Sequence, residues 1–133
     1  MNQPAIQPVI LPVLLIEDEA GVMAYVRATL ERSGYAVVCA QSGAEGIQLL
    51  ETGDFLGVVS DMVTPGGVNG AGVHAWIARN RPDLASRIVF ITGDIANEET
   101  VATLRRTGAP CVEKPFRVQQ FIDVVEKTMG KAP

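Results

Sequence analysis

The fold of this chain is decided by Phe55-Leu56-Gly57-Val58-Val59-Ser60-Asp61, an apolar run that ends at a carboxylate. The next residues, 62–67, include a proline and two glycines, which interrupt regular structure. A short apolar run bounded in this way predicts a buried strand. We therefore expect Asp61 to lie at the carboxyl end of a strand, at the edge of a sheet.

Two other apolar runs end in the same way. Residues 13–16 are followed by Glu17 and Asp18, and residues 88–91 are followed by Thr92. In an open parallel sheet the carboxyl ends of the strands line one edge, where ligands bind. The polar residues that follow these runs are therefore expected to converge on one site.

Strand-like and helical patterns alternate along the rest of the chain. The predicted strands are 13–16, 35–40, 56–60, 87–91 and 110–113, and the predicted helices are 19–32, 42–52, 71–80, 97–106 and 118–129. Because the strands are almost continuously apolar, they imply a parallel sheet covered by helices on both faces. Crossover connections are short and right-handed, so few topologies are compatible with this alternation. We predict an α/β, flavodoxin-like (βα)5 fold whose five-stranded parallel sheet has the strand order 2-1-3-4-5.

Several helix boundaries are marked by residue type. Ser42 with Glu45 three residues later has the spacing of a capping box, and Asn97 is a second candidate N-cap. Proline disfavours helix at the preceding residue, so Pro82 should end the third helix, and Gly108 should end the fourth.

Length and composition indicate one domain. The chain has 133 residues, of which 47% are hydrophobic, enough for a single core. Residues 1–12 contain Pro4, Pro8 and Pro12 and little periodicity, so we expect a flexible tail or linker there. The domain is expected to occupy residues 13–130.

Charge and hydropathy exclude several functional classes. The net charge is −4 and the basic residues are scattered, which argues against direct nucleic-acid binding. No apolar run approaches the roughly 20 residues that span a bilayer, and the amino terminus lacks a basic secretory start. These features predict a cytoplasmic protein without membrane insertion.

Other chemically suggestive residues are better explained by structure. Cys39 and Cys111 lie far apart in apolar surroundings, which favours reduced core thiols over a metal or redox pair. His74 has no ligand partners at metal-binding spacing, and Trp76 is expected to pack within its helix. The glycines of 66–72 do not have the spacing of a nucleotide-binding loop.

The three acids at the expected sheet edge suggest a metal. Carboxylates that share a site repel one another, which raises their proton affinity or requires a cation. Mg²⁺ prefers oxygen ligands and accepts one or two carboxylates while keeping several waters. We expect Asp18 and Asp61 to be direct ligands and Glu17 to act through water.

The same residues suit phosphoryl chemistry. An aspartate such as Asp61 can attack phosphorus and form an aspartyl phosphate. The charge on the transferring oxygens must then be neutralised, which Mg²⁺ and a lysine can do while a hydroxyl adds a hydrogen bond. Lys114 and Thr92 are of the required types, and Pro115 favours a fixed turn that could hold the lysine inward.

Four segments together resemble the receiver domain of two-component response regulators. They are Leu14 to Glu19, Val58 to Pro65, Ile91 to Gly93 and Glu113 to Phe116, and they occur in the order found in that family. Each segment alone is common, but the set of four is specific and extends from Val13 to the last predicted helix.

The resemblance implies a role for each site residue. Asp61 would be the phosphoacceptor, and Asp18, Asp61 and the Val63 backbone carbonyl would hold Mg²⁺. Thr92 and Lys114 would contact the phosphoryl group. The implied partner is a histidine kinase or a histidine phosphotransfer protein, and a homodimer through the last helices is a further expectation. Such a domain catalyses its own phosphoryl transfer and autodephosphorylation and does not turn over an external substrate.

Three features depart from the family pattern. Thr64 stands where methionine usually precedes the proline, and the loop 65–70 is one residue longer than usual, as in receivers attached to hybrid histidine kinases. Cys111 occupies the switch position, where related chains usually carry Tyr or Phe that moves when the threonine, here Thr92, contacts the phosphoryl group. A phosphorylation-independent interaction module with the receiver fold is therefore the alternative hypothesis.

Overall fold

The computed structural model describes residues 10–64 and 66–132 and contains a five-stranded parallel sheet. The strands are β1 (Val13–Ile16), β2 (Val37–Ala40), β3 (Gly57–Asp61), β4 (Ile88–Thr92) and β5 (Cys111–Glu113). The helices are α1 (Ala20–Arg32), α2 (Gly43–Thr52), α3 (Gly70–Asn80), the 3₁₀ helix η1 (Pro82–Leu84), α4 (Glu98–Thr107) and α5 (Val118–Met129). The strand order β2-β1-β3-β4-β5 confirms the predicted fold.

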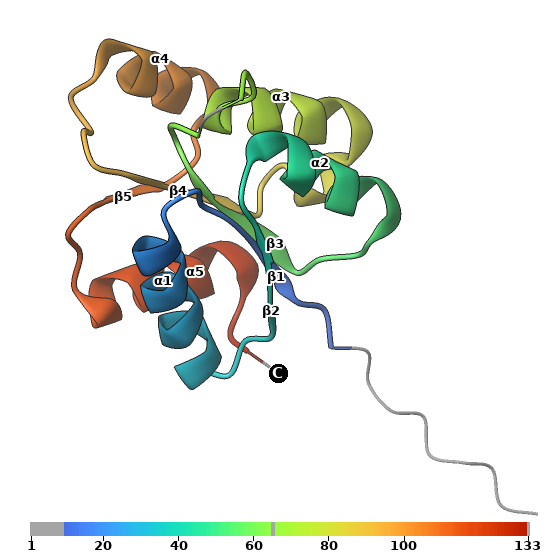
Figure 1. Cartoon of the computed structure of the whole chain (residues 1–133), viewed down its shortest axis with the longest axis vertical. Coiled ribbons are helices and arrows are strands. Elements are labelled where there is room, and N and C mark those ends of the chain that lie inside the picture. Colours follow the sequence, from blue (N-terminus) through green and yellow to red (C-terminus); the bar gives the residue numbers. More distant parts are fainter. Residues whose placement is uncertain (1–9, 65, 133) are drawn as a thin grey trace, which may run out of the picture.

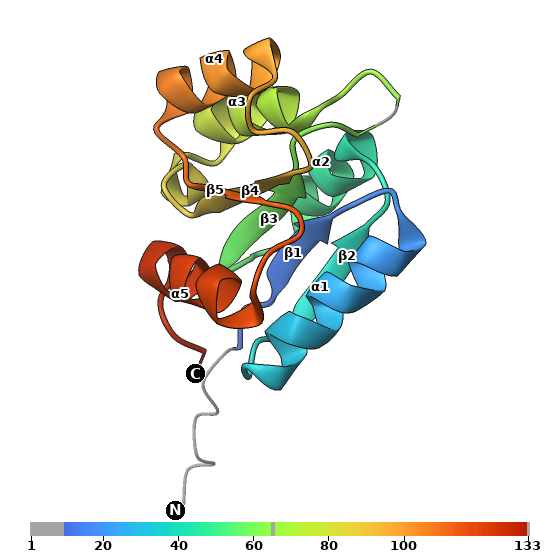
Figure 2. The same cartoon turned by 90° about the vertical axis from the view of Figure 1, so that its left-hand side faces the viewer.

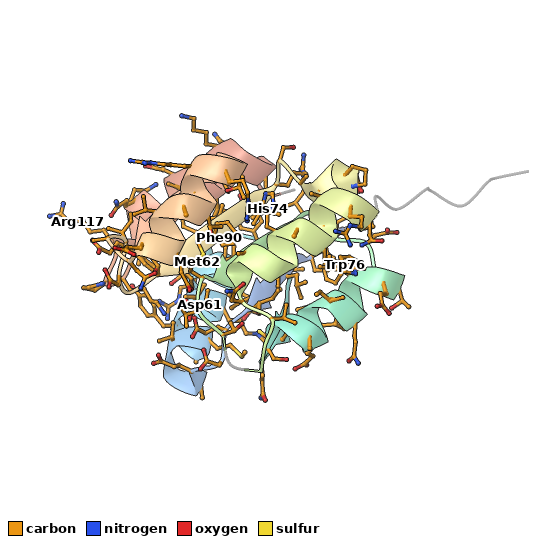
Figure 3. All side chains as sticks on the ribbon, turned by 90° about the horizontal axis from the view of Figure 1, so that it is seen from above. Asp61, Met62, His74, Trp76, Phe90 and Arg117 are labelled. Atoms are coloured by element: carbon orange, nitrogen blue, oxygen red, sulfur yellow. The ribbon has the colours of Figure 1, made fainter. Side chains whose placement is uncertain are left out.

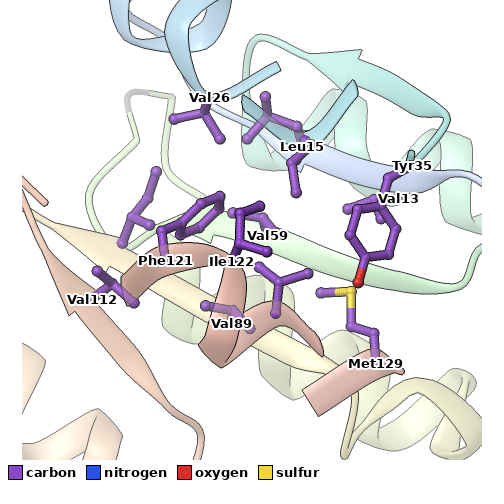
Figure 4. Close-up of a cluster of buried hydrophobic side chains, with 13 residues drawn as sticks. Val13, Leu15, Val26, Tyr35, Val59, Val89, Val112, Phe121, Ile122 and Met129 are labelled. Carbon is purple, nitrogen blue, oxygen red and sulfur yellow. The ribbon is translucent and has the colours of Figure 1, made fainter. Parts of the chain in front are cut away.

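Helices cover both faces of the sheet. Helices α1 and α5 lie on one face, and α2, α3 and α4 lie on the other (Figures 1 and 2). Successive residues of β1 alternate between the two cores: Val13 and Leu15 join the cluster under α1 and α5, and Leu14 and Ile16 join the opposite one. The first cluster packs β-branched strand residues against aromatic and aliphatic residues of α5 (Figure 4). Burial on both faces is the reason that the strands are apolar at every position.

Two strands extend further than the sequence predicts. Asp61 is the last residue of β3, and Thr92 is the last residue of β4, one residue beyond the expected ends. The backbone of a polar residue can pair as well as that of an apolar one, and Met62 N–H donates to Ile91 O at 2.9 Å just beyond Asp61. Both functional side chains are therefore held by strand backbone and not by loops.

Four predicted strands start too early. The third, fourth and fifth begin one residue later than predicted, and the second, predicted over 35–40, begins two residues later, at Val37. Gly34 adopts a φ of 96°, and Tyr35 N–H still donates to Leu30 O at 3.1 Å, so the chain is turning at this point. Tyr35 is buried, and its hydroxyl donates to Gly130 O at 2.7 Å. Tyr35 is therefore an aromatic residue because it packs in the core, and not because it pairs in the sheet.

The predicted helix ends are largely confirmed. The Ser42 hydroxyl accepts the Glu45 N–H at 3.1 Å, whereas the Glu45 carboxylate accepts from Gln41 and not from Ser42 as in a strict capping box. Asn97 caps α4, which ends at Gly108 with a φ of 69°. The sequence reasoning missed Asn69, whose side chain caps α3 by accepting the Gly72 N–H at 2.9 Å.

The expected tail is only partly described. Residues 1–9 lie outside the described residues, as does Pro65 of the predicted loop. Pro12 O accepts the Leu56 N–H at 2.8 Å, so the chain is already tied to the domain at that residue. No helix within 10–64 or 66–132 has the length and apolar character needed to cross a membrane.

Candidate functional site

The carboxyl edge of the sheet brings the predicted site residues together. β1 ends before Glu17 and Asp18, β3 ends on Asp61 and β4 ends on Thr92. The residue after β5 is Lys114. An open pocket at this edge is lined by Asp18, Glu19, Asp61, Val63, Thr92, Gly93, Asp94, Asn97, Thr100 and Lys114. Seen from above, Asp61 lies close to Met62 (Figure 3).

Three carboxylates form the acidic part of the site. Glu17, Asp18 and Asp61 each offer an oxygen, and these atoms lie within 4.8 Å of one another. Asp18 is exposed, whereas Glu17 has no exposed surface and Asp61 is 6% exposed. Burial, together with the nearby Asp61 carboxylate, raises the pKa of Glu17 to about 7. The site therefore holds concentrated negative charge in a poorly solvated position.

Lys114 balances part of this charge. Its Nζ lies 3.5 Å from Glu17 Oε2 and 3.5 Å from Asp61 Oδ2. The Lys114 N–H donates to Thr92 O at 2.7 Å, and the peptide bond between Lys114 and Pro115 is cis. One ammonium group faces three carboxylates, so the site retains negative charge that a cation can neutralise.

The buried oxygen of Glu17 supports a metal. Glu17 Oε1 accepts the Glu19 N–H at 3.2 Å, whereas Oε2 is buried and has no hydrogen-bond partner among the described residues, its nearest cation being the Lys114 ammonium at 3.5 Å. Lys114 is shared with Asp61, so one ammonium does not fully compensate the buried carboxylate, and a further cation or water would. The all-oxygen donor set suits Mg²⁺. The residues present therefore fit the divalent ion that the sequence suggests.

The two carboxylate oxygens of Asp61 face different groups. Oδ1 accepts the Val63 N–H at 3.3 Å, and Oδ2 faces Lys114. Val63 is 67% exposed and lines the pocket, as expected if the Val63 backbone faces the site. The carboxylate is thus oriented from both sides while its pocket stays open.

Thr92 is buried with its hydroxyl at the pocket. Its side chain is 2% exposed, and its Oγ1 accepts the Asp94 N–H at 3.2 Å. Because that bond uses an oxygen lone pair, the hydroxyl proton stays available for an acceptor in the pocket. Asn97 and Thr100 also line the pocket, and the sequence reasoning treated Asn97 only as a helix cap.

Cys111 lies on β5, opposite Phe90 of β4. It is half-buried and packs against the core under α2 and α3. Burial raises the pKa of its thiol to about 11, so it is almost entirely protonated near neutral pH. Cys39 is also half-buried, and both thiols are free. Cys39 and Cys111 were predicted to be core thiols, but each is only partly buried and packs at the margin of a core.

His74 and Trp76 have structural surroundings. The His74 ring lies on the side of α3 that faces Phe90, with ring centroids 6.2 Å apart (Figure 3). Burial lowers the pKa of His74. Trp76 is partly buried and packs against the hydrophobic cluster that contains Phe90. Neither residue lines the acidic pocket.

An apolar groove adjoins the acidic pocket. It is lined by Gly21, Val22, Tyr25, Lys114, Pro115 and Phe116. Tyr25 is 49% exposed, and its ring centroid lies 6.0 Å from that of Phe116. Lys114 lines both the groove and the pocket, so the two adjoin at this residue. The sequence reasoning missed this groove because its residues come from α1 and the distant loop between β5 and α5.

Comparisons with known proteins agree with the geometry. The family model described as the response regulator receiver domain matches residues 13–126. The response regulator receiver protein CpdR of Brucella abortus (strain 2308) is 27% identical over 117 residues, which cover 88% of this chain and 95% of CpdR. The sensor kinase CckA of the same organism is 33% identical over 125 residues, but the match covers 90% of this chain and only 12% of the kinase.

Solved structures show the same architecture. A receiver domain protein (CheY-like) from Methanospirillum hungatei JF-1 superposes with a TM-score of 0.81 at 20% identity, covering 91% of this chain and 94% of that protein. Chemotaxis protein CheY4 of Vibrio cholerae gives a TM-score of 0.77 at 21% identity, covering 90% of this chain and 99% of CheY4. At this level of identity the likeness establishes the fold.

Proposed function

This chain belongs to the response regulator receiver domain family of two-component systems, and we propose that it accepts a phosphoryl group from phosphohistidine onto Asp61. We assign this activity to a domain of residues 13–130. The observation that carries the proposal is the placement of Asp61 between Lys114 Nζ, 3.5 Å away, and two further carboxylates within 4.8 Å.

The proposed reaction transfers phosphorus from nitrogen to oxygen. A carboxylate oxygen of Asp61 attacks the phosphorus of phosphohistidine, the N–P bond breaks, and the imidazole leaves with the bonding electron pair. The product is an aspartyl phosphate, which water later hydrolyses to restore Asp61. Each step needs the negative charge of the phosphoryl oxygens to be balanced in a site that is already acidic.

Three sets of groups of this chain would stabilise the phosphoryl oxygens, by charge, by a hydrogen bond and by holding a cation. Lys114, 3.5 Å from Asp61 Oδ2, would move from the carboxylate to a phosphoryl oxygen. The Thr92 hydroxyl, whose proton is not donated to any of the described residues, would donate to a second oxygen. Asp18, Asp61 and the Val63 carbonyl would hold Mg²⁺, with Glu17 acting through a water. When bound, Mg²⁺ supplies positive charge to the transferring oxygens.

The proposed donor is a histidine kinase or a histidine phosphotransfer protein. The apolar groove at Tyr25 and Phe116 adjoins the acidic pocket at Lys114, so a donor helix placed on the groove would hold its phosphohistidine near Asp61. The similarity to part of the sensor kinase CckA supports this class of partner. A homodimer through the last helices stays a prediction.

A small phosphodonor tests the chemistry without a partner. Acetyl phosphate with Mg²⁺ is expected to add one phosphoryl group to the wild type, measured by intact mass, and none to Asp61→Asn. Lys114→Ala should slow the transfer while leaving the acceptor in place. If the wild type gains nothing, the alternative of a phosphorylation-independent interaction module, which the missing aromatic at Cys111 favours, replaces the proposal.

A further inference from the structure

The loop between β3 and α3 is closed by a side-chain hydrogen bond. The Thr64 hydroxyl donates to the carbonyl oxygen of Val68 at 2.6 Å, and Thr64 is only 7% exposed. This short, largely buried bond joins the two ends of a tight loop. Methionine, which related receivers usually carry at this position, has no donor with which to make it.

The middle of the loop has few other restraints. Gly66 and Gly67 adopt φ angles of 89° and 85°, a conformation that residues with a Cβ rarely adopt. A Cβ built at either glycine meets no atom within 4 Å, so this part of the loop is not packed. The closed form of the loop therefore depends on its two ends.

The Val68 end is packed against α2. A Cβ at Gly43 would overlap the Val68 carbonyl oxygen and lie 2.9 Å from Val68 Cγ1, so only glycine permits this approach. The same Val68 oxygen accepts the Thr64 hydroxyl. Val68 is thus held between the first residue of α2 and the residue that directly follows Val63.

We propose that Thr64 is a positioning residue that fixes the backbone at Val63 for metal binding. The inference rests on the proposed function, which assigns the Val63 carbonyl to the Mg²⁺ site. With its neighbour Thr64 tied to Val68, and with Val63 N–H donating to Asp61 at 3.3 Å, the Val63 backbone is restrained on both sides. A loop that leaves this closed form binds Mg²⁺ more weakly in proportion to the closed population lost.

The test compares Mg²⁺ affinity in the full chain, by amide chemical-shift titration with MgCl₂. Thr64→Val keeps the shape and removes the donor, and it should raise the Kd by up to about fivefold, the limit set by the loss of one buried hydrogen bond. Thr64→Ser restores the hydroxyl and should return the Kd to the wild-type value. Thr128→Val is the matched control, because that hydroxyl also donates to a backbone carbonyl four residues away, Val124 O at 2.7 Å, but far from the site.

A second variant reaches the loop without touching Thr64. Gly43→Ala places a methyl group against Val68 and should also weaken Mg²⁺ binding, although alanine by itself favours the helix. In the metal-free chain, Thr64→Val should speed hydrogen exchange of the Gly70 amide, which donates to Met62 O at 2.9 Å across the base of the loop. Exchange reports on the loop independently of activity.

The outcomes separate this inference from the proposed function. A wild type that binds Mg²⁺ and a Thr64→Val variant with the same Kd would overturn the positioning role and leave the proposed function intact. Equal weakening by Thr128→Val would also overturn it, since the effect would then be general. A wild type without any Mg²⁺-dependent shift would remove the proposed metal site and this inference together.

Discussion

Neutralising Glu17 should stabilise the metal-free chain at neutral and alkaline pH. Glu17 has no exposed surface, and burial with the adjacent Asp61 carboxylate raises its pKa from 4.5 to about 7. A group whose pKa is higher in the folded state contributes stability below its unfolded pKa and loses it as the pH rises through the folded pKa. Folding of the wild type is therefore penalised increasingly between about pH 4.5 and pH 7, and the full penalty applies above that range.

The size of the penalty follows from the shift. At about 1.4 kcal/mol per pKa unit, a rise from 4.5 to about 7 corresponds to at most about 3.5 kcal/mol. Glu17→Gln removes the ionisation and keeps an oxygen that can accept the Glu19 N–H, now accepted by Oε1 at 3.2 Å. The attraction of Lys114 lowers the pKa of Glu17 and is therefore already included in this shift. Glutamine replaces a protonated glutamate imperfectly, so we expect a net gain on the order of 2 kcal/mol at pH 8.5.

Urea unfolding in EDTA, from pH 4.5 to pH 8.5, measures this gain. The difference between variant and wild type should be near zero at the acidic end and grow to its full value by pH 8.5. Mg²⁺ at ~10 mM should reduce it by stabilising the wild type. Glu31→Gln is the control, because Glu31 is half-exposed in a surface ion pair with Arg27 and should change stability by less than about 1 kcal/mol. A variant that is less stable at pH 8.5, or a difference that does not vary with pH, would refute the reasoning.

Three further predictions concern metal, partner and switch. Mg²⁺ at ~10 mM should stabilise the wild type by about 1.4 kcal/mol if its Kd is ~1 mM, which would raise the melting temperature by a few degrees. Asp18→Ala should abolish this response, and a variant that still responds fully shows that Asp18 is not a ligand. Tyr25→Arg should leave phosphorylation by acetyl phosphate unchanged but slow transfer from a histidine donor about tenfold, and equal rates with the donor would remove the groove from the docking surface. Because Cys111 is far smaller than Tyr or Phe, beryllium fluoride should change hydrogen exchange mainly in residues 63–70 and 92–96; strong protection changes across Cys111 and the first half of α5 would contradict this.

The sequence predicted the sheet because the information is local. Each strand is a short apolar run with a polar or turn residue after it, and the handedness of the connections leaves few strand orders, of which the flavodoxin-like one was chosen. The same pattern placed Asp61 and Thr92 at the correct edge, although both belong to the strands themselves. The side chains of Asp61 and Thr92 are polar, so the apolar pattern stops before them, and only the backbone pairing shows that they belong to β3 and β4.

What the sequence could not predict depends on contacts between distant segments. It ranked Asp18 above Glu17, but only the fold shows that Glu17 is fully buried and that its Oε2 has no hydrogen-bond partner among the described residues. The groove between Tyr25 and Phe116 and the packing of Val68 on Gly43 each join segments far apart in the chain. Asn69 was detectable, since an Asn before a helix is a common N-cap, but the surrounding glycines obscured the helix start.

The identity of the phosphoacceptor is tested most directly by mapping the modified residue. After reaction with acetyl phosphate and Mg²⁺, borohydride reduces an aspartyl phosphate to homoserine, which peptide mass spectrometry locates in the chain. The proposed function predicts homoserine at position 61 and at no other aspartate, with Mg²⁺ required for the yield. Homoserine at Asp18, or none at any position under conditions in which the chain is folded, would contradict it.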